Sequence, residues 1–186
     1  PEDEHDKYII LPYFWIPEDN LELRVRRDHV PYDVWERQGF LQTTEGNVVH
    51  YGYIEKFIET MGEQYNIREI AFDRWGAVQM VQNLEGMGFT VVPFGQGFKD
   101  MSPPTKELMK LTLEKKIAHG GQPVLSWMMD NIFIKSDPAG NIKADKEKST
   151  EKIDGVVATI MALDRAIRCG NDMSESVYDR RGLLVL

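Results

Sequence analysis

Ile67-Arg68-Glu69-Ile70-Ala71-Phe72-Asp73 is a short apolar run that ends in a carboxylate. Runs of this length with β-branched and aromatic residues are typical of buried strands, so we expect Asp73 at the carboxyl end of a strand. A helical pattern over about 77–87 follows, and residues 89–94 form a second apolar run. The order strand, helix, strand predicts a crossover that joins two parallel strands, and therefore an α/β fold.

A second aspartate, Asp154, lies where a long helical pattern over about 150–168 begins. With Ser149 as the N-cap, Asp154 falls in the second turn, on the apolar side of this helix. Two carboxylates held close together repel each other unless a cation lies between them. Magnesium or manganese is the natural cation for such hard oxygen ligands. Each aspartate alone also has an ordinary explanation, as a turn residue or as a solvated charge near a helix N-terminus.

The composition is ordinary for a globular domain, with 42% hydrophobic and 28% charged residues. A chain of 186 residues suits one domain with a hydrophobic core. No apolar stretch approaches about 20 residues, so we expect no membrane span. The single cysteine, Cys169, excludes a disulfide within the chain and favours a reducing compartment. The glycine-rich P-loop pattern of many ATPases does not occur.

Lysines gather near the second aspartate. The formal net charge of the chain is −8, and a net negative charge argues against broad affinity for nucleic acid. Lys143, Lys146 and Lys148 precede Asp154, and Lys99 follows the glycine-containing loop 95–97. Cations beside metal-binding carboxylates are what a phosphate backbone requires, so these four lysines are candidate DNA contacts. The alternative for Lys146 and Lys148 is a mobile charged loop.

Further helices and strands are predicted on both sides of this unit. The additional predicted strands cover residues 8–16, with an interruption at Pro12, and residues 132–136, and residues 46–51 are predicted as a short strand or an extended piece. The additional predicted helices cover about 20–27, 32–38, 53–65, 103–118 and 124–131, with a turn at 137–141 and a charged loop at 143–148. We expect one domain over residues 1–170 and a tail over residues 171–186.

Several longer strings carry a resemblance to a known family. They are Ile70-Ala71-Phe72-Asp73-Arg74-Trp75, Gly95-Gln96-Gly97-Phe98-Lys99, Met101-Ser102-Pro103-Pro104-Thr105-Lys106-Glu107-Leu108, His119-Gly120-Gly121, Asp137-Pro138-Ala139-Gly140-Asn141-Ile142-Lys143 and Asp145-Lys146-Glu147-Lys148-Ser149-Thr150-Glu151-Lys152-Ile153-Asp154-Gly155. In this order they resemble the C-terminal nuclease domain of the large subunit of tailed-bacteriophage terminases, and residues 176–184 resemble that family's C-terminus.

The resemblance implies a ribonuclease H-like mixed sheet flanked by helices. It also implies a metal-dependent endonuclease that cuts concatemeric double-stranded viral DNA during packaging. Of the three acidic residues that hold metals in that family, the acid at the end of the fourth strand matches Asp73 and the acid on the last helix matches Asp154. The first acid belongs on the first, central strand. We expect that strand upstream of Pro1, so that this fragment is weak or inactive without it.

Two divalent ions about 4 Å apart can activate a water molecule and stabilise the leaving oxygen of a phosphodiester. Asp145 is a possible auxiliary ligand, although an exposed Asp beside lysines is the simpler interpretation. His119 has a pKa that suits proton transfer, although a helix end is the simpler interpretation of His119-Gly120-Gly121. Gly155 and Ala158 are small, so we expect them to let the last helix approach the sheet and bring Asp154 near Asp73.

The resemblance further implies an ATPase domain upstream in the same polypeptide, and the portal and the small terminase subunit as partners. It implies a location in the cytoplasm of the infected or lysogenic bacterial host. Two other classes of function compete with the nuclease: a non-catalytic module that guides DNA or docks on the portal, and another ribonuclease H-like enzyme such as a resolvase or transposase.

Overall fold

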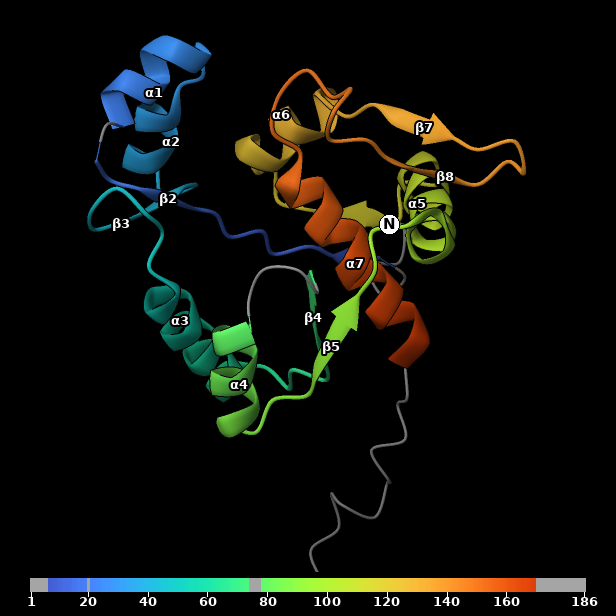
Figure 1. Cartoon of the computed structure of the whole chain (residues 1–186), viewed down its shortest axis with the longest axis horizontal. Helices are drawn as coiled ribbons and strands as arrows, with labels where there is room; N and C mark the ends of the chain where they lie inside the picture. The colour runs from blue at the N-terminus through green and yellow to red at the C-terminus, as the bar shows by residue number, and fades with distance from the viewer. Residues whose placement is uncertain (1–6, 20, 74–77, 170–186) are drawn as a thin grey trace, which may run out of the picture.

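A computed structural model of the chain describes residues 7–19, 21–73 and 78–169. Its helices are α1 (Leu21–Asp28), α2 (Tyr32–Arg37), α3 (Tyr51–Gln64), α4 (Val78–Gly86), α5 (Phe98–Leu113), α6 (Pro123–Asp130) and α7 (Asp154–Cys169). Its strands are β1 (Tyr8–Ile9), β2 (Trp15–Pro17), β3 (Gln42–Thr44), β4 (Ile70–Asp73), β5 (Val91–Phe94), β6 (Ile117–Ala118), β7 (Ile134–Ser136) and β8 (Ile142–Ala144). The predicted alternation of helices and strands is therefore present (Figure 1).

The strands of the described residues pair two by two rather than in one continuous mixed sheet. β1–β6, β2–β3 and β4–β5 are parallel pairs, and β7–β8 is an antiparallel hairpin. The parallel pairing of β4 with β5, which the sequence predicted, is confirmed. Prolines help to explain the division, because Pro12 follows β1 and the exposed Pro93 lies within β5, and neither residue has an N–H for a ladder.

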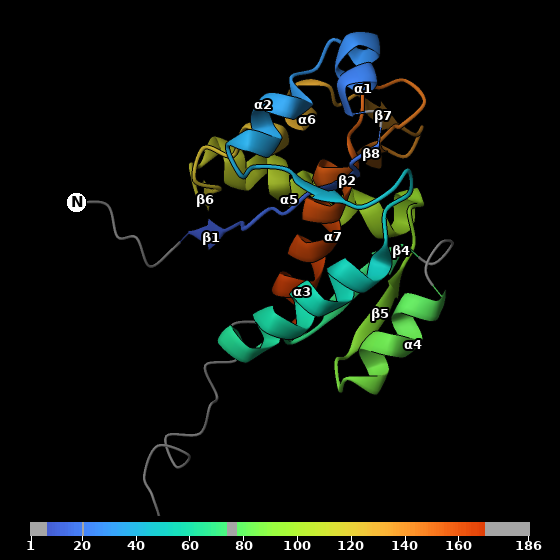
Figure 2. The ribbon, with the colours of Figure 1, turned by 90° about the vertical axis from the view of Figure 1, so that its left-hand side faces the viewer.

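Helix α7 forms the centre of the core. Val156 and Ile160 have no exposed surface, and the helix packs against α5, α6 and β4. Figure 1 shows the β4–β5 pair between α7 and the α3–α4 pair, and in the view of Figure 2 α3 and α7 lie on one side of β4–β5 and α4 on the other. The apolar side chains along one stripe of α7 are buried, and this burial stabilises the packing of α5, α6 and β4 against the helix.

Two predictions in the first half of the chain are wrong. The predicted strand over 8–16 is two strands, β1 and β2, because the chain leaves the ladder around Pro12. The strand predicted over 46–51 is also wrong, because the strand of this region lies earlier in the chain. It is β3, which ends at the buried Thr44. Gly46 then adopts φ +86 in a bend, and α3 begins at Tyr51.

The helix predicted over 103–118 is displaced towards the N-terminus. Helix α5 begins at Phe98 and contains Pro103 and Pro104, because the burial of neighbours such as Met101 compensates for the missing hydrogen bonds. It ends at Leu113, and Lys115 has φ +57. Ile117–Ala118 then pairs with β1, so His119 follows a strand and not the expected helix end.

The charged loop predicted over 143–148 overlaps the end of β8, because Lys143 and Ala144 belong to that strand. Helix α7 begins at Asp154 and not near residue 150. Ser149 does not cap it, because its hydroxyl donates to the carbonyl of Asp145 (2.6 Å) and accepts from the N–H of Phe133 (3.1 Å).

Other predictions concern residues outside the described ranges. The tail over 171–186 and the residues 74–77 that follow Asp73 belong to this group. Within the ranges that the structure describes, no helix combines the length and the apolar character that crossing a membrane requires.

Candidate metal and DNA site

The two predicted metal ligands lie towards the same end of the β4–α7 contact. Glu69, just before β4, has its Oε2 atom 2.5 Å from Nε of Arg165 near the end of α7. From there β4 runs about 13 Å to Asp73, and α7 runs back about 16 Å to Asp154. Figure 1 shows the two elements running in opposite directions, with the end of β4 and the start of α7 both uppermost.

Asp73 is half-buried at the carboxyl end of β4, as predicted. Its Oδ2 atom accepts a hydrogen bond from Nε2 of Gln96 (2.7 Å). Gln96 follows β5, whose Phe94 is the register partner of Asp73, so the contact arises where two parallel strands end. Sequence reasoning missed Gln96, although its position just past the neighbouring parallel strand was a usable signal.

Asp154 is the first residue of α7 and its side chain is 67% exposed, so its predicted place on the apolar side of the helix is wrong. Its Oδ1 atom lies 2.8 Å from Nζ of Lys146. A carboxylate in the first turn is favoured by the helix dipole, which explains why this position accepts a charge. The expected help from Ala158 is also absent, because that residue is exposed.

A hollow of about 260 Å³ is lined by one contact partner of each aspartate, although neither aspartate lines it. It is lined by Gln96, Met101, Lys135, Lys143, Ala144, Asp145, Lys146, Glu147 and Val157. Gln96 contacts Asp73 and Lys146 contacts Asp154, so the hollow is bounded on two sides by partners of the candidate ligands. Three of the lining residues are lysines, which makes the hollow suited to an anion such as a phosphate.

Lys143 and Lys135 reach this hollow from the β7–β8 hairpin. Lys143 donates from Nζ to the carbonyl of Gln96 (3.1 Å), and the same Nζ lies 5.4 Å from the centroid of the Phe98 ring. The DNA contacts predicted from the sequence include Lys143 but not Lys135. In the sequence Lys135 is one polar residue in a short strand, and only the hairpin pairing brings it beside Lys143.

Asp145 is buried, with 6% of its surface exposed, so its interpretation as an exposed loop residue is wrong. Burial by itself raises the pKa of this carboxyl. The N–H groups of Glu147 and Lys148 and the ammonium of Lys135 outweigh burial, and the net pKa is lowered. Asp145 therefore stays charged at neutral pH.

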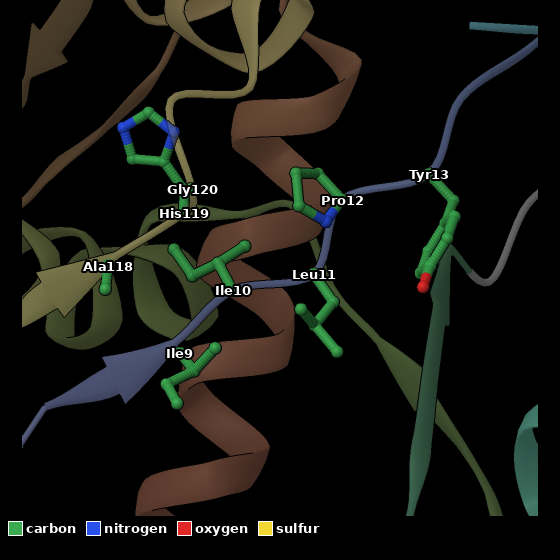
Figure 3. Close-up of a pocket in the computed structure, with 8 residues that line it drawn as sticks. All are labelled: Ile9, Ile10, Leu11, Pro12, Tyr13, Ala118, His119 and Gly120. Atoms are coloured by element: carbon green, nitrogen blue, oxygen red, sulfur yellow. The ribbon is translucent and has the colours of Figure 1, made fainter. Parts of the chain in front are cut away.

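The remaining candidates lie outside the hollow. Lys99 is exposed in the first turn of α5, and Lys148 is exposed with Nζ 5.5 Å from the centroid of the Phe133 ring. His119 lines a different hollow of about 310 Å³, between residues 9–13 and the end of β6 (Figure 3). Its Nδ1 atom is buried and has no hydrogen-bond partner within the described part of the chain.

Within residues 7–19, 21–73 and 78–169, no group of three or more His, Cys, Asp or Glu side chains could hold a metal ion. Asp73 and Asp154 nevertheless supply the hard oxygen donors that a divalent ion prefers. Among the described residues, the amide of Gln96 contacts Asp73 and the partly exposed ammonium of Lys146 contacts Asp154.

The chain is similar to known proteins over most of its length. Residues 1–169 match the family model described as terminase large subunit, endonuclease domain. The chain is 40% identical over 159 residues to the terminase large subunit of Enterobacteria phage HK97, covering 84% of this chain and 32% of that protein. It is 31% identical over 166 residues to protein YmfN of Escherichia coli (strain K12), covering 86% and 36% respectively. The chain thus spans about a third of the length of these curated relatives.

Solved structures show the same fold. The crystal structure of the HK97 bacteriophage large terminase aligns with a TM-score of 0.80 at 40% identity, covering 86% of this chain and 34% of that one. The large terminase nuclease of thermophilic phage G20c with bound magnesium aligns with a TM-score of 0.50 at 15% identity, covering 64% of each chain, which supports the fold alone. The predicted ribonuclease H-like α/β class is confirmed. The chain belongs to the family of terminase large-subunit endonuclease domains.

Proposed function

We propose that this chain is a divalent-metal-dependent DNA endonuclease in which Asp73 and Asp154 share the metal. The observation that carries the proposal is the lysine-lined hollow between the partners of these two carboxylates. A phosphodiester in this hollow would meet the ammonium groups of Lys135, Lys143 and Lys146, and Gln96 and Lys146 link the hollow to Asp73 and Asp154. This combination suits a phosphate that must be both bound and attacked.

Asp73 and Asp154 would hold magnesium or manganese, with two ions in the complete site. When bound, such ions neutralise charge on the phosphate and act as Lewis acids. Oxygen-only donors fit these hard cations. The G20c nuclease, which shares the fold, has been crystallised with bound magnesium.

The side chains around the carboxylates have their own tasks in this proposal. Gln96 orients Asp73 through its Nε2–Oδ2 hydrogen bond. Lys143 and Lys146 bind the phosphate in the hollow, because their ammonium groups line it and can turn towards an anion. Lys99 and Lys148, which are exposed, contact more distant phosphates through charge alone.

The substrate in this proposal is double-stranded concatemeric viral DNA, cut during genome packaging in the cytoplasm of an infected or lysogenic bacterial host. The proposed partners are an ATPase domain of the same polypeptide, the portal and the small terminase subunit. Family membership supports this setting, and the greater length of the relatives, of which this chain spans about a third, leaves room for further domains.

Nicking of supercoiled plasmid DNA in the presence of Mn²⁺, by the polypeptide that includes the proposed ATPase domain, tests the site. Asp73→Asn and Asp154→Asn should each lower the rate on the order of 10³-fold, since several kcal/mol of metal stabilisation would be lost. Binding of Mn²⁺, followed by electron paramagnetic resonance, should weaken in the same variants even if turnover is slow.

Asp137→Asn is the matched control, because Asp137 is a turn aspartate of the β7–β8 hairpin and does not line the hollow. This variant should cut and bind Mn²⁺ as the unchanged protein does. Wild-type nicking in both the Asp73 and Asp154 variants would refute the proposed site.

A second candidate function is a non-catalytic module that guides DNA or docks on the portal. It is favoured by the ion pair of Lys146 with Asp154 and by the lack of a three-ligand group among the described residues. DNA binding without Mn²⁺ binding and without nicking would support this second function over the nuclease.

A further inference from the structure

Residues 145–149 form a short loop between β8 and α7 that is tied to Phe133 at both ends. The N–H of Asp145 donates to the carbonyl of Phe133 (2.9 Å), and the N–H of Phe133 donates to Oγ of Ser149 (3.1 Å). Ser149 closes the loop, because its N–H (3.0 Å) and its hydroxyl (2.6 Å) both donate to the carbonyl of Asp145. The base of the loop is therefore well defined.

The carboxylate of Asp145 organises the interior of this loop. Its Oδ1 atom accepts from the N–H of Glu147 (3.0 Å), and the N–H of Lys148 also stabilises its charge. Its Oδ2 atom lies 3.6 Å from Nζ of Lys135 and has no hydrogen-bond partner within the described part of the chain. A carboxylate that is 94% buried must be compensated by hydrogen bonds or an opposite charge. Here the N–H groups of the loop and the ammonium of Lys135 supply that compensation.

The loop carries Lys146 on its outer side. The Lys146 side chain is 49% exposed, and its Nζ lies 2.8 Å from Oδ1 of Asp154. A half-exposed lysine has many rotamers, and holding its ammonium in one place costs entropy. A rigid backbone on either side of Lys146 lowers that cost by restricting where the side chain begins.

We infer that Asp145 is a positioning residue: it holds the loop that directs the Lys146 ammonium towards Asp154 and the hollow. It acts through Lys146 and is not a metal ligand. The importance of Asp145 for DNA cleavage rests on the proposed function. The claim that Asp145 places Lys146 does not depend on that function.

Charge and geometry make opposite predictions for DNA binding by Asp145→Ala. Removing a negative charge beside three lysines should strengthen binding if charge alone matters. If Asp145 positions Lys146, binding should weaken by about the same factor as in Lys146→Met, and the slope of log affinity against log salt should fall by about 1 in both variants. Asp137→Ala is the matched control, because Asp137 also accepts two main-chain N–H bonds, from Ala139 (2.9 Å) and Asn141 (2.8 Å).

A double-mutant cycle separates positioning from general stability. With Lys146→Met already present, Asp145→Ala should cause no further loss of DNA affinity or nicking rate. Asp137→Ala should leave both quantities within about twofold of the unchanged protein. Losses that add in the double variant, or tighter DNA binding by Asp145→Ala, would overturn the inference.

A third measurement does not depend on DNA. After reductive ¹³C-methylation of the lysines, the Lys146 signal should move towards that of a solvated lysine in Asp154→Asn and equally in Asp145→Ala. A signal that responds to Asp154→Asn and not to Asp145→Ala would overturn the inference even if the protein cuts DNA. The expected shifts without any nicking would preserve the inference and refute the nuclease.

Discussion

Gly155 is the residue at which the position of Asp154 can be disturbed most directly. A Cβ atom at Gly155 would lie 2.6 Å from Cε1 of Phe14 and 2.9 Å from Sδ of Met128. The N–H of Gly155 also donates to that sulfur atom (3.1 Å). The start of α7 is therefore pressed against Phe14 and Met128, and any side chain at this position must displace one of them.

Gly155→Ala should lower the free energy of unfolding by about 1–2 kcal/mol. Overpacking in a core costs about 1–3 kcal/mol, and the gain in helix propensity from Gly to Ala returns up to about 1 kcal/mol. For a chain of this size the loss corresponds to a decrease in Tm of about 2–8 °C. Because the start of α7 must shift, nicking should fall as well, and Gly155→Leu should have a larger effect on both quantities.

Urea unfolding followed by tryptophan fluorescence measures the effect, and Gly52→Ala is the matched control. Gly52 is the second residue of α3, as Gly155 is of α7, but nothing lies within 4 Å of its Cβ position. Gly52→Ala should be neutral or stabilising. Phe14→Leu should recover part of the loss in Gly155→Ala by making room. Equal stability of the Gly155→Ala and Gly52→Ala variants would refute the proposed close contact.

Two further predictions concern ion pairs. Lys146→Met should tighten Mn²⁺ binding by up to about fivefold by calorimetry, because an exposed ion pair that competes for Asp154 is worth about 0.2–1 kcal/mol. Unchanged or weaker binding would contradict competition. The hydrogen bond from Arg165 lowers the pKa of Glu69, so its stabilisation is present above the ordinary Glu pKa of about 4.3 and is lost as the pH falls through the lowered folded value. The urea midpoint of the unchanged protein should therefore fall more between pH 6 and pH 3 than that of Glu69→Gln, and parallel decreases in the two proteins would contradict the linkage.

Local sequence signals predicted the elements in which neighbouring residues decide the structure. The apolar run before Asp73 and the helix after it are patterns within single segments, and the predicted parallel pair is present. The start of α7 was predicted wrongly because Ser149 has the right chemistry for an N-cap but uses its hydroxyl on Asp145 and Phe133. A capping preference cannot reveal a competing partner from another strand.

The surroundings of the two aspartates were less predictable than the aspartates themselves. Lys135 lies beside Asp145 because two strands pair, and Gln96 meets Asp73 because two parallel strands end together. Asp145 is buried because its own loop folds over it. The position of Gln96 just past a parallel strand was a usable signal, whereas the contact of Lys135 and the burial of Asp145 leave no periodic or compositional trace in the chain.

The order of residues along this chain was enough to predict its α/β class, its family and the two carboxylates of the candidate site. These properties follow from short-range periodicity and from long matching strings. Packing between distant segments decided that Gln96 contacts Asp73, that Lys135 lies beside Asp145, and where α7 begins. Hydrogen-bond partners and burial depend on the approach of residues tens of positions apart, and that approach exists only once the helices and strands have assembled.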